Sequence, residues 1–276
     1  DVVEEKIVVG AEKQFDDSQQ ASYEKTPSSF DRSIEPPYDD SPLVINTPQV
    51  WQNKLANGLT LYGIENSEVP LVSFNIEIAG GMLFDQPNKI GVARLTAELM
   101  NRGTKSKTRA ELEDAIKKLG AQIHVSANKQ SIAINGTTLA KNYSETMAIV
   151  KEILLAPRWD KVEFDLAKDA TINSIKQMAA NPNSIAALEF QKLLYGQDHL
   201  LANSHFGTEK SVNEINIADL KAYYKNALSP NLANFHVVGD VTQQAVNDSV
   251  KDLARNWQNK SLNLPQLTMP TMPEKA

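Results

Sequence analysis

Two charged residues in the segment 91–104, Arg94 and Glu98, stand one helical turn apart, and Ala97 lies between them. Apolar residues recur through the segment at steps of three and four, and Gly103 follows them, so a helix is expected here. Side chains four residues apart share one face of a helix, and a helix can present two metal ligands in this way. Arginine cannot ligate a metal ion because its guanidinium does not deprotonate in proteins, and alanine cannot take a proton from water. The segment therefore predicts the frame of a metal-binding helix without the residues for its chemistry.

In the inverted zinc motif H-x-x-E-H, two histidines hold the metal ion and the glutamate activates a water molecule. When the segment GVARLTAELMNRGT is set against this motif, Arg94 and Glu98 occupy the histidine positions and Ala97 occupies the glutamate position. The segment resembles G-[IV]-A-H-[FL]-L-E-H-M-x-F-[KR]-G-T, which is typical of the insulinase/pitrilysin (M16) zinc peptidases, a family that includes the mitochondrial processing peptidases.

Further stretches resemble the same family and follow its order between residues 50 and 258. They are K-L-A-N-G-L-T at 54–60, V-P-L-V-S through A-G-G at 69–81, G-T-E at 207–209, L-K-A-Y-Y with S-P-N at 220–231, and V-V-G-D-V at 237–241. The resemblance implies the fold of an M16 domain, which is the LuxS/MPP-like metallohydrolase fold.

The resemblance also locates the third zinc ligand, a glutamate on a later helix of active M16 members. The corresponding stretch is 170–176, where Asn173 and Ser174 stand in place of the glutamates. A catalytic zinc ion needs three protein ligands and one open position, and none of the three matching positions carries the family's ligand. We therefore expect no zinc and no other cofactor in this chain, with zinc only in a partner domain or subunit.

Composition and charge exclude several classes of protein. The chain has 276 residues, of which 41% are apolar, and it has no cysteine, which excludes disulfides and thiolate metal sites. No apolar run approaches the about 20 residues of a membrane span. The net charge is −6, and residues 1–40 alone carry −7. The sequence has no stripe of basic residues interleaved with aromatic residues, which would indicate nucleic-acid binding.

The distribution of charge and proline predicts three segments. Residues 1–45 are expected to be an acidic extended linker, residues 46–262 an M16-like α+β domain, and residues 263–276 a proline-containing C-terminal linker. Linkers at both ends, together with the lack of a starting Met and of a signal peptide, suggest a piece of a longer chain. In M16 chains with several domains, an active half and a degenerate half enclose a peptide, and the resemblance implies the first domain of the degenerate half. A free-standing subunit that partners an active one is the alternative.

The domain is expected to be α+β, with an antiparallel sheet and helices packed on one of its faces. Asn57-Gly58 indicates a two-residue hairpin turn, and alternation over 72–78 indicates a half-buried strand. Thr108 and Glu111 form a predicted capping box. The remaining elements are expected as strands at 122–126, 131–138 and 234–238, and as helices at 143–155, 161–179, 184–194, 216–227 and around 246–257.

The other candidate residues carry weaker signals. His124 and His236 fall within predicted strands, where a lone histidine is more often a packed or surface residue than a ligand. His199 and His205 share a loop and could form an adventitious metal site, but no third ligand is evident. Neither G-x-S-x-G nor a G-x-x-x-x-G-K-[ST] phosphate loop occurs. Arg94 and Glu98 are expected to form an ion pair that replaces the metal structurally.

Three functions fit these observations. The first is a non-catalytic domain of an M16 peptidase, inactive alone, that helps enclose and position an extended peptide beside an active M16 half in the same or another chain. The strand 71–80 is its candidate edge for pairing with the peptide. The second is a structural or assembly subunit with no peptide role. The third is an enzyme with a relocated site, for which the sequence has no motif. Resemblance to multi-domain M16 chains implies the periplasm or the cell envelope.

Overall fold

The computed structural model describes residues 31, 33–34, 47–268 and 270. The predicted linker 1–45 lies almost entirely outside the described residues, as does the end of the predicted linker 263–276. From Thr47 onward the chain belongs to one compact unit, and all elements below lie in it. Within the described residues, no helix is both long and apolar enough to cross a membrane.

The unit is built on one six-stranded sheet with the order β1-β2-β6-β3-β5-β4. The strands are β1 (Trp51–Lys54), β2 (Thr60–Glu65), β3 (Leu71–Ala79), β4 (Gln122–Ala127), β5 (Ser131–Leu139) and β6 (Ala233–Gly239). Neighbours are antiparallel except for β2 and β6, which run parallel with Thr60 opposite Asn234. The sheet is therefore mixed: it is antiparallel, as expected, except at this one pair. The physical cause is that β6 inserts between β2 and β3, which run in opposite directions, so β6 must be parallel to one of them.

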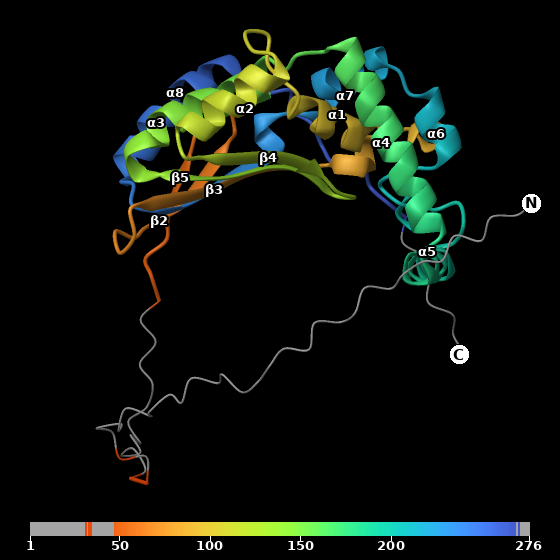
Figure 1. Cartoon of the computed structure of the whole chain (residues 1–276), viewed down its shortest axis with the longest axis horizontal. Helices are drawn as coiled ribbons and strands as arrows, with labels where there is room; N and C mark the ends of the chain where they lie inside the picture. Colours follow the sequence, from red (N-terminus) through yellow and green to blue (C-terminus); the bar gives the residue numbers. More distant parts are fainter. Residues whose placement is uncertain (1–30, 32, 35–46, 269, 271–276) are drawn as a thin grey trace, which may run out of the picture. The chain divides into compact units, whose positions relative to one another are not determined.

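Eight α-helices accompany the sheet within the described residues. They are α1 (Val92–Met100), α2 (Arg109–Lys118), α3 (Tyr143–Leu155), α4 (Lys161–Ala179), α5 (Pro182–Tyr195), α6 (Glu209–Glu214), α7 (Ile217–Ala227) and α8 (Gln243–Asn256). In Figure 1, α2, α3 and α8 lie over the same face of the sheet, and α4, α5 and α6 lie beyond α1. The α+β class with helices on one face, expected from the sequence, is confirmed.

The core lies between this face of the sheet and the helices. Along β3, Val72, Phe74, Ile76 and Ile78 are buried, whereas Glu77 between them is exposed. This alternation follows from the two-residue period of a strand, which sends successive side chains to opposite faces. The opposite face carries polar side chains together with the exposed apolar residues Leu71 and Val238. There the amide of Asn75 donates to Asn135 at 2.8 Å.

The position of β3 differs from the sequence-based expectation. The segment 71–80 was expected to be an edge strand, but β3 pairs with β5 on one side and with β6 on the other. The edges of the sheet are β1 and β4. The expectation was wrong because β6, which begins more than 150 residues after β3 ends, occupies the hydrogen-bonding edge of β3.

Two glycines with positive φ differ in the space around them. Gly207 has a φ of 78°, and a Cβ there would lie 2.1 Å from the carbonyl oxygen of Ile90. Gly196 has a φ of 89°, but a Cβ there would meet nothing within 4 Å. The turn at Gly207 therefore holds the loop directly against the chain that leads into α1.

We predict that Gly207→Ala destabilises the domain much more than Gly196→Ala. Gly196→Ala adds only a side chain at φ 89° and ψ 147°, a conformation that few residues other than glycine adopt, at about 1–3 kcal/mol. Gly207→Ala adds to this an overpacking cost of about 1–3 kcal/mol, because the carbonyl of Ile90 cannot move freely. Urea denaturation of both variants measures the difference, and equal losses would show that the contact at Ile90 carries no constraint.

Candidate functional site

The helix that matches the zinc motif is α1, and its first turn is held by a buried carboxylate. Asp85 Oδ2 accepts a hydrogen bond from the N–H of Gly91 at 2.8 Å, and Oδ1 accepts one from the N–H of Ala93 at 2.9 Å. These N–H groups have no partner within the helix, so a carboxylate at this end satisfies them and interacts favourably with the helix dipole. Gly91 itself has a φ of 113°. The helix packs against α7, β4 and α4.

The structure places the four matched positions in different surroundings. Arg94 and Glu98 are half-buried on α1, Ala97 is buried between them, and Asn173 is exposed on α4. An arginine, an alanine and an amide at three of these positions do not form a donor set that suits zinc, which takes imidazole, thiolate or carboxylate ligands. The residues present therefore do not fit a catalytic zinc ion.

The predicted ion pair between Arg94 and Glu98 does not form. Glu98 Oε1 instead accepts hydrogen bonds from Arg102, at 3.2 Å from Nε and 2.8 Å from Nη2. Arg102 Nη1 donates to Glu163 on α4 at 2.9 Å. The planar fork of an arginine can bind two carboxylates at once, so Arg102 takes the partner that Arg94 was expected to have.

Arg94 turns toward the loop that precedes α6. Its guanidinium carbon lies 3.8 Å from the centroid of the Phe206 ring, a cation–π contact. Burial lowers the pKa of Arg94, and the nearby Glu98 carboxylate opposes this shift. The side chain at the first zinc-ligand position is thus packed on an aromatic ring.

We predict that Arg102→Ala destabilises the domain by about 2 kcal/mol, because it leaves the carboxylates of Glu98 and Glu163 without their shared charged donor. The Arg102 side chain is only 11% exposed, so solvent screens the network incompletely. The matched control is Lys118→Ala, which removes an exposed pair with Asp114 on α2 and should cost much less, because solvent screens an exposed ion pair. Chemical denaturation of both variants tests this, and similar small losses would contradict a bridge between α1 and α4.

The two loop histidines are held by other groups. His199 Nδ1 accepts the N–H of Leu201 at 3.1 Å, and its ring stacks on Tyr195 with 5.3 Å between centroids. The His205 ring packs against Phe206 with 4.6 Å between centroids. His124 lies on β4 and His236 on β6, as expected. In the part of the chain that the structure describes, no three His, Cys, Asp or Glu side chains converge as they would around a metal ion.

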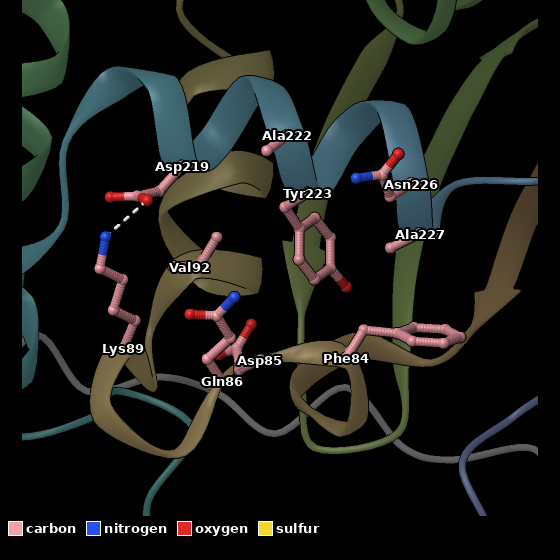
Figure 2. Close-up of a pocket in the computed structure, with 10 residues that line it drawn as sticks. All are labelled: Phe84, Asp85, Gln86, Lys89, Val92, Asp219, Ala222, Tyr223, Asn226 and Ala227. Carbon is pink, nitrogen blue, oxygen red and sulfur yellow. Dashed lines mark hydrogen bonds and ion pairs between the residues drawn. The ribbon is translucent and has the colours of Figure 1, made fainter.

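Asp85 also faces a small pocket between the approach to α1 and helix α7. Figure 2 shows Tyr223 and Asn226 reaching into the pocket from α7, and Lys89 bound to Asp219 at one side. The Lys89–Asp219 ion pair measures 2.6 Å. The pocket volume of about 180 Å³ is below the about 300–1,000 Å³ of typical small-molecule sites. The pocket is therefore smaller than a typical binding site, and Asp85 beside it remains buried.

Burial controls the ionisation of this group. It raises the pKa of Asp85 to about 7, although the backbone hydrogen bonds at the start of α1 oppose the shift. The hydroxyl of Tyr223 donates to the carbonyl of Gly81 at 2.8 Å, and burial, assisted by the Asp85 charge, raises the pKa of Tyr223. Two titratable groups are thus kept in a poorly solvated space.

We predict that Asp85 makes the stability of the domain fall as the pH rises from 4 to 7. Its folded pKa of about 7 lies above the unfolded value of about 3.9. In this range the folded state binds the proton that the unfolded state has released, so the stabilisation is full below pH 4 and is lost as the pH passes 7. The loss is on the order of a few kcal/mol at about 1.4 kcal/mol per pH unit.

Urea denaturation of the unchanged chain and of Asp85→Asn at pH 4.5 and 7.5 measures this contribution. The stability of the unchanged chain relative to Asp85→Asn should be lower at pH 7.5 than at pH 4.5. Asp240→Asn, at an exposed position, serves as the control and should show no such change. An equal difference at both pH values would contradict a raised pKa.

A side chain binds the free backbone groups at the centre of the edge strand β4. The N–H of Val125 donates to Asn101 Oδ1 at 2.7 Å, and Asn101 Nδ2 donates to the carbonyl oxygen of Val125 at 2.7 Å. One carboxamide therefore makes both hydrogen bonds that a neighbouring strand would make at Val125. The sequence analysis missed Asn101, although it stands where the family pattern carries an aromatic residue, and this departure was the available signal.

Comparison with known proteins identifies the family. Residues 63–232, more than half of the chain, match the description "Insulinase (Peptidase family M16)". The chain belongs to the M16 family. The expectation drawn from the helix at 91–104 and the stretches around it is therefore confirmed.

The relatives of this chain include one named a non-peptidase homolog and one named a zinc protease. The non-peptidase homolog YmxG of Helicobacter pylori is 24% identical over 203 residues, which cover 73% of this chain and 45% of that protein. The uncharacterized zinc protease YmxG of Bacillus subtilis is 20% identical, with 71% of this chain and 47% of that protein covered. The chain thus spans about half the length of these relatives.

Solved structures share the fold. The crystal structure of a peptidase M16 inactive domain from Pseudomonas fluorescens superimposes with a TM-score of 0.74 at 22% identity, covering 80% of this chain and 54% of that one. The periplasmic protease PqqL from Escherichia coli gives a TM-score of 0.71 at 19% identity, covering 84% of this chain and 26% of that one. These similarities show that the chain shares the fold of M16 domains.

Proposed function

We propose that this M16 chain is a non-catalytic domain that helps enclose and position a peptide, while zinc and cleavage belong to an active M16 half. The observation that carries the proposal is the state of the first zinc-ligand position. Arg94 there is packed on Phe206 at 3.8 Å, and an arginine can neither ligate zinc nor activate water. Zinc is accordingly proposed for the partner half and not for this chain.

The neighbouring positions support the same proposal. Glu98 is bound to Arg102, which also binds Glu163 on α4. Ala97 is buried and has no acid–base group, and Asn173 is an exposed amide. Restoring the family's residue at one of these positions alone would not restore the zinc ion, its bound water and the general base together.

Enclosure fits the open face of the sheet better than strand addition does. This face carries polar groups such as the Asn75–Asn135 amide pair and the stacked rings of Tyr62 and His236. Strand addition at β4 would require a peptide to displace Asn101 from Val125. The proposed role is therefore to form one wall of a chamber, which restricts access to short or unfolded peptides.

The proposed partner is an active M16 half in the same or another chain. The chain covers about half of its relatives, which is consistent with a further M16 domain beside it. The periplasm or the cell envelope is the proposed location, with the name of the periplasmic protease PqqL as its support.

A structural or assembly role is the second candidate, and α5 favours it. Phe190, Leu193 and Leu194 on this helix are 64%, 85% and 52% exposed. Exposed apolar residues that cluster on one element are typical of contact with another protein. An assembly subunit would use this surface without any peptide on the sheet.

Zinc content and peptide cleavage test the proposal directly. The purified chain should contain substoichiometric zinc and should not cleave a fluorogenic peptide. Mixing it with a zinc-bearing M16 half should raise cleavage above that of the half alone. Stoichiometric zinc or cleavage by the chain alone would contradict the proposal.

Size-exclusion chromatography of the same mixture separates the two candidates. A complex that forms without any change in cleavage or peptide binding would favour the assembly role. The double variant Phe190→Ser/Leu193→Ser changes only exposed residues of α5, and it should weaken the complex if this helix is the contact. The control variant Lys221→Ser, at an exposed position on α7, should leave the complex unchanged.

A further inference from the structure

The guanidinium of Arg94 lacks the hydrogen-bonding partners that a half-buried charge normally has. Among the described residues, its Nε is buried without a hydrogen-bond partner. Glu98, one turn along α1, is bound to Arg102 instead. A buried donor without a partner destabilises the folded state, and more so when it belongs to a charged group. Such a group is retained at a cost unless something binds it.

Two further basic side chains, from other elements, lie close enough for their charges to interact with Arg94 or with each other. His205 packs against Phe206, the same ring on which Arg94 lies. Lys129, in the turn between β4 and β5, is anchored by the carbonyl oxygen of Leu201 at 2.6 Å and by Gln191 Oε1 at 2.5 Å. An ammonium group has three N–H donors, so Lys129 retains one.

The electrostatics of this cluster agree with its geometry. Burial lowers the pKa of His205, and the charges of Arg94 and Lys129 lower it further. Burial also lowers the pKa of Lys129. The positive charges of Arg94 and Lys129 near the imidazole of His205 would repel a metal ion and attract an anion.

We propose that Arg94, Lys129 and His205 bind a carboxylate group of the enclosed peptide. We call these three residues the cationic site. The proposal rests on the proposed role in peptide enclosure, and it specifies that the site recognises a carboxylate. The planar fork of a guanidinium matches the two oxygens of a carboxylate, and stacking on Phe206 fixes the orientation of the fork. Every peptide carries such a group at its C-terminus, and acidic side chains carry it internally.

Binding at this site takes up a proton. A carboxylate beside His205 favours the charged imidazolium and raises the pKa of His205 from its lowered value. Affinity for the carboxylate therefore increases as the pH falls from 7.5 to 5.5. The groups that face His205 are Arg94 and Lys129, with Glu98 near Arg94, and the guanidinium of Arg94 keeps its charge over this range.

The test compares three peptides on the full chain at pH 6. They are N-acetyl-pentaalanine with a free C-terminal carboxylate, its C-terminal amide, and the same amide with one internal glutamate. Calorimetry should show about tenfold tighter binding of at least one carboxylate peptide than of the neutral amide, since a hydrogen bond to a charged group is worth about that factor. Tight binding of the free C-terminus alone assigns the site to chain ends, and tight binding of both assigns it to carboxylates in general.

Variants separate the site from general effects. Arg94→Gln should abolish the preference for carboxylate peptides, and His205→Gln should abolish its pH dependence, while Lys54→Gln, at an exposed lysine on β1, should change neither. His205 ring resonances, followed by NMR during peptide addition to the unchanged chain, provide a readout that does not depend on folding of a variant. They should shift with a carboxylate peptide and not with the amide.

Equal binding of the three peptides, no binding of any, or an unchanged preference in a folded Arg94→Gln chain would overturn the inference. The proposed function is judged separately by cleavage of the neutral amide-type peptide with a zinc-bearing M16 half. If that cleavage rises in the mixture while the carboxylate preference is absent, only the cationic site is rejected. If the preference is present but cleavage never rises, only the enclosure role is rejected.

Discussion

The carboxylate of Asp85 holds the N–H groups of Gly91 and Ala93, and the position of α1 follows from this contact. Because α1 packs against β4, α7 and α4, its first turn fixes where the sheet meets the helices beyond it. The chain around Gly91 has a left-handed conformation, which directs the carboxylate and the helix end toward each other. A frame of this kind can persist when the catalytic side chains change, because none of its contacts involves a metal ligand.

The charges near α1 are divided between two tasks. Arg102 connects Glu98 to Glu163 and so links α1 to α4 through opposite charges. Arg94 takes no part in this link and lies instead against Phe206, near His205 and Lys129. In an active M16 member one zinc ion would concentrate positive charge at this place. Here the guanidinium of Arg94 and the ammonium of Lys129 supply positive charge, and both belong to the chain itself.

The sequence predicted those features that depend on neighbouring residues. The capping box at Thr108 and a hairpin around Asn57-Gly58 formed as expected, since each rests on spacing within one segment. The hairpin loop is longer than the two residues expected, because β1 ends at Lys54 and β2 begins only at Thr60. The features that it missed depend on contacts between distant segments. The insertion of β6 beside β3 placed that strand at the centre of the sheet, and Arg102 took Glu98 from Arg94. Asp85 was also missed, because it reaches α1 from six residues before Gly91, across a short turn.

The contact of Asn101 with Val125 has a consequence for the behaviour of the domain in solution. An open strand edge is a template on which identical sheets from separate molecules can join, and natural proteins block such edges. A carboxamide that makes both backbone hydrogen bonds in the middle of β4 leaves no continuous run of unpaired groups along this edge. The same residue that separates β4 from an incoming peptide thus protects the domain from edge-to-edge aggregation.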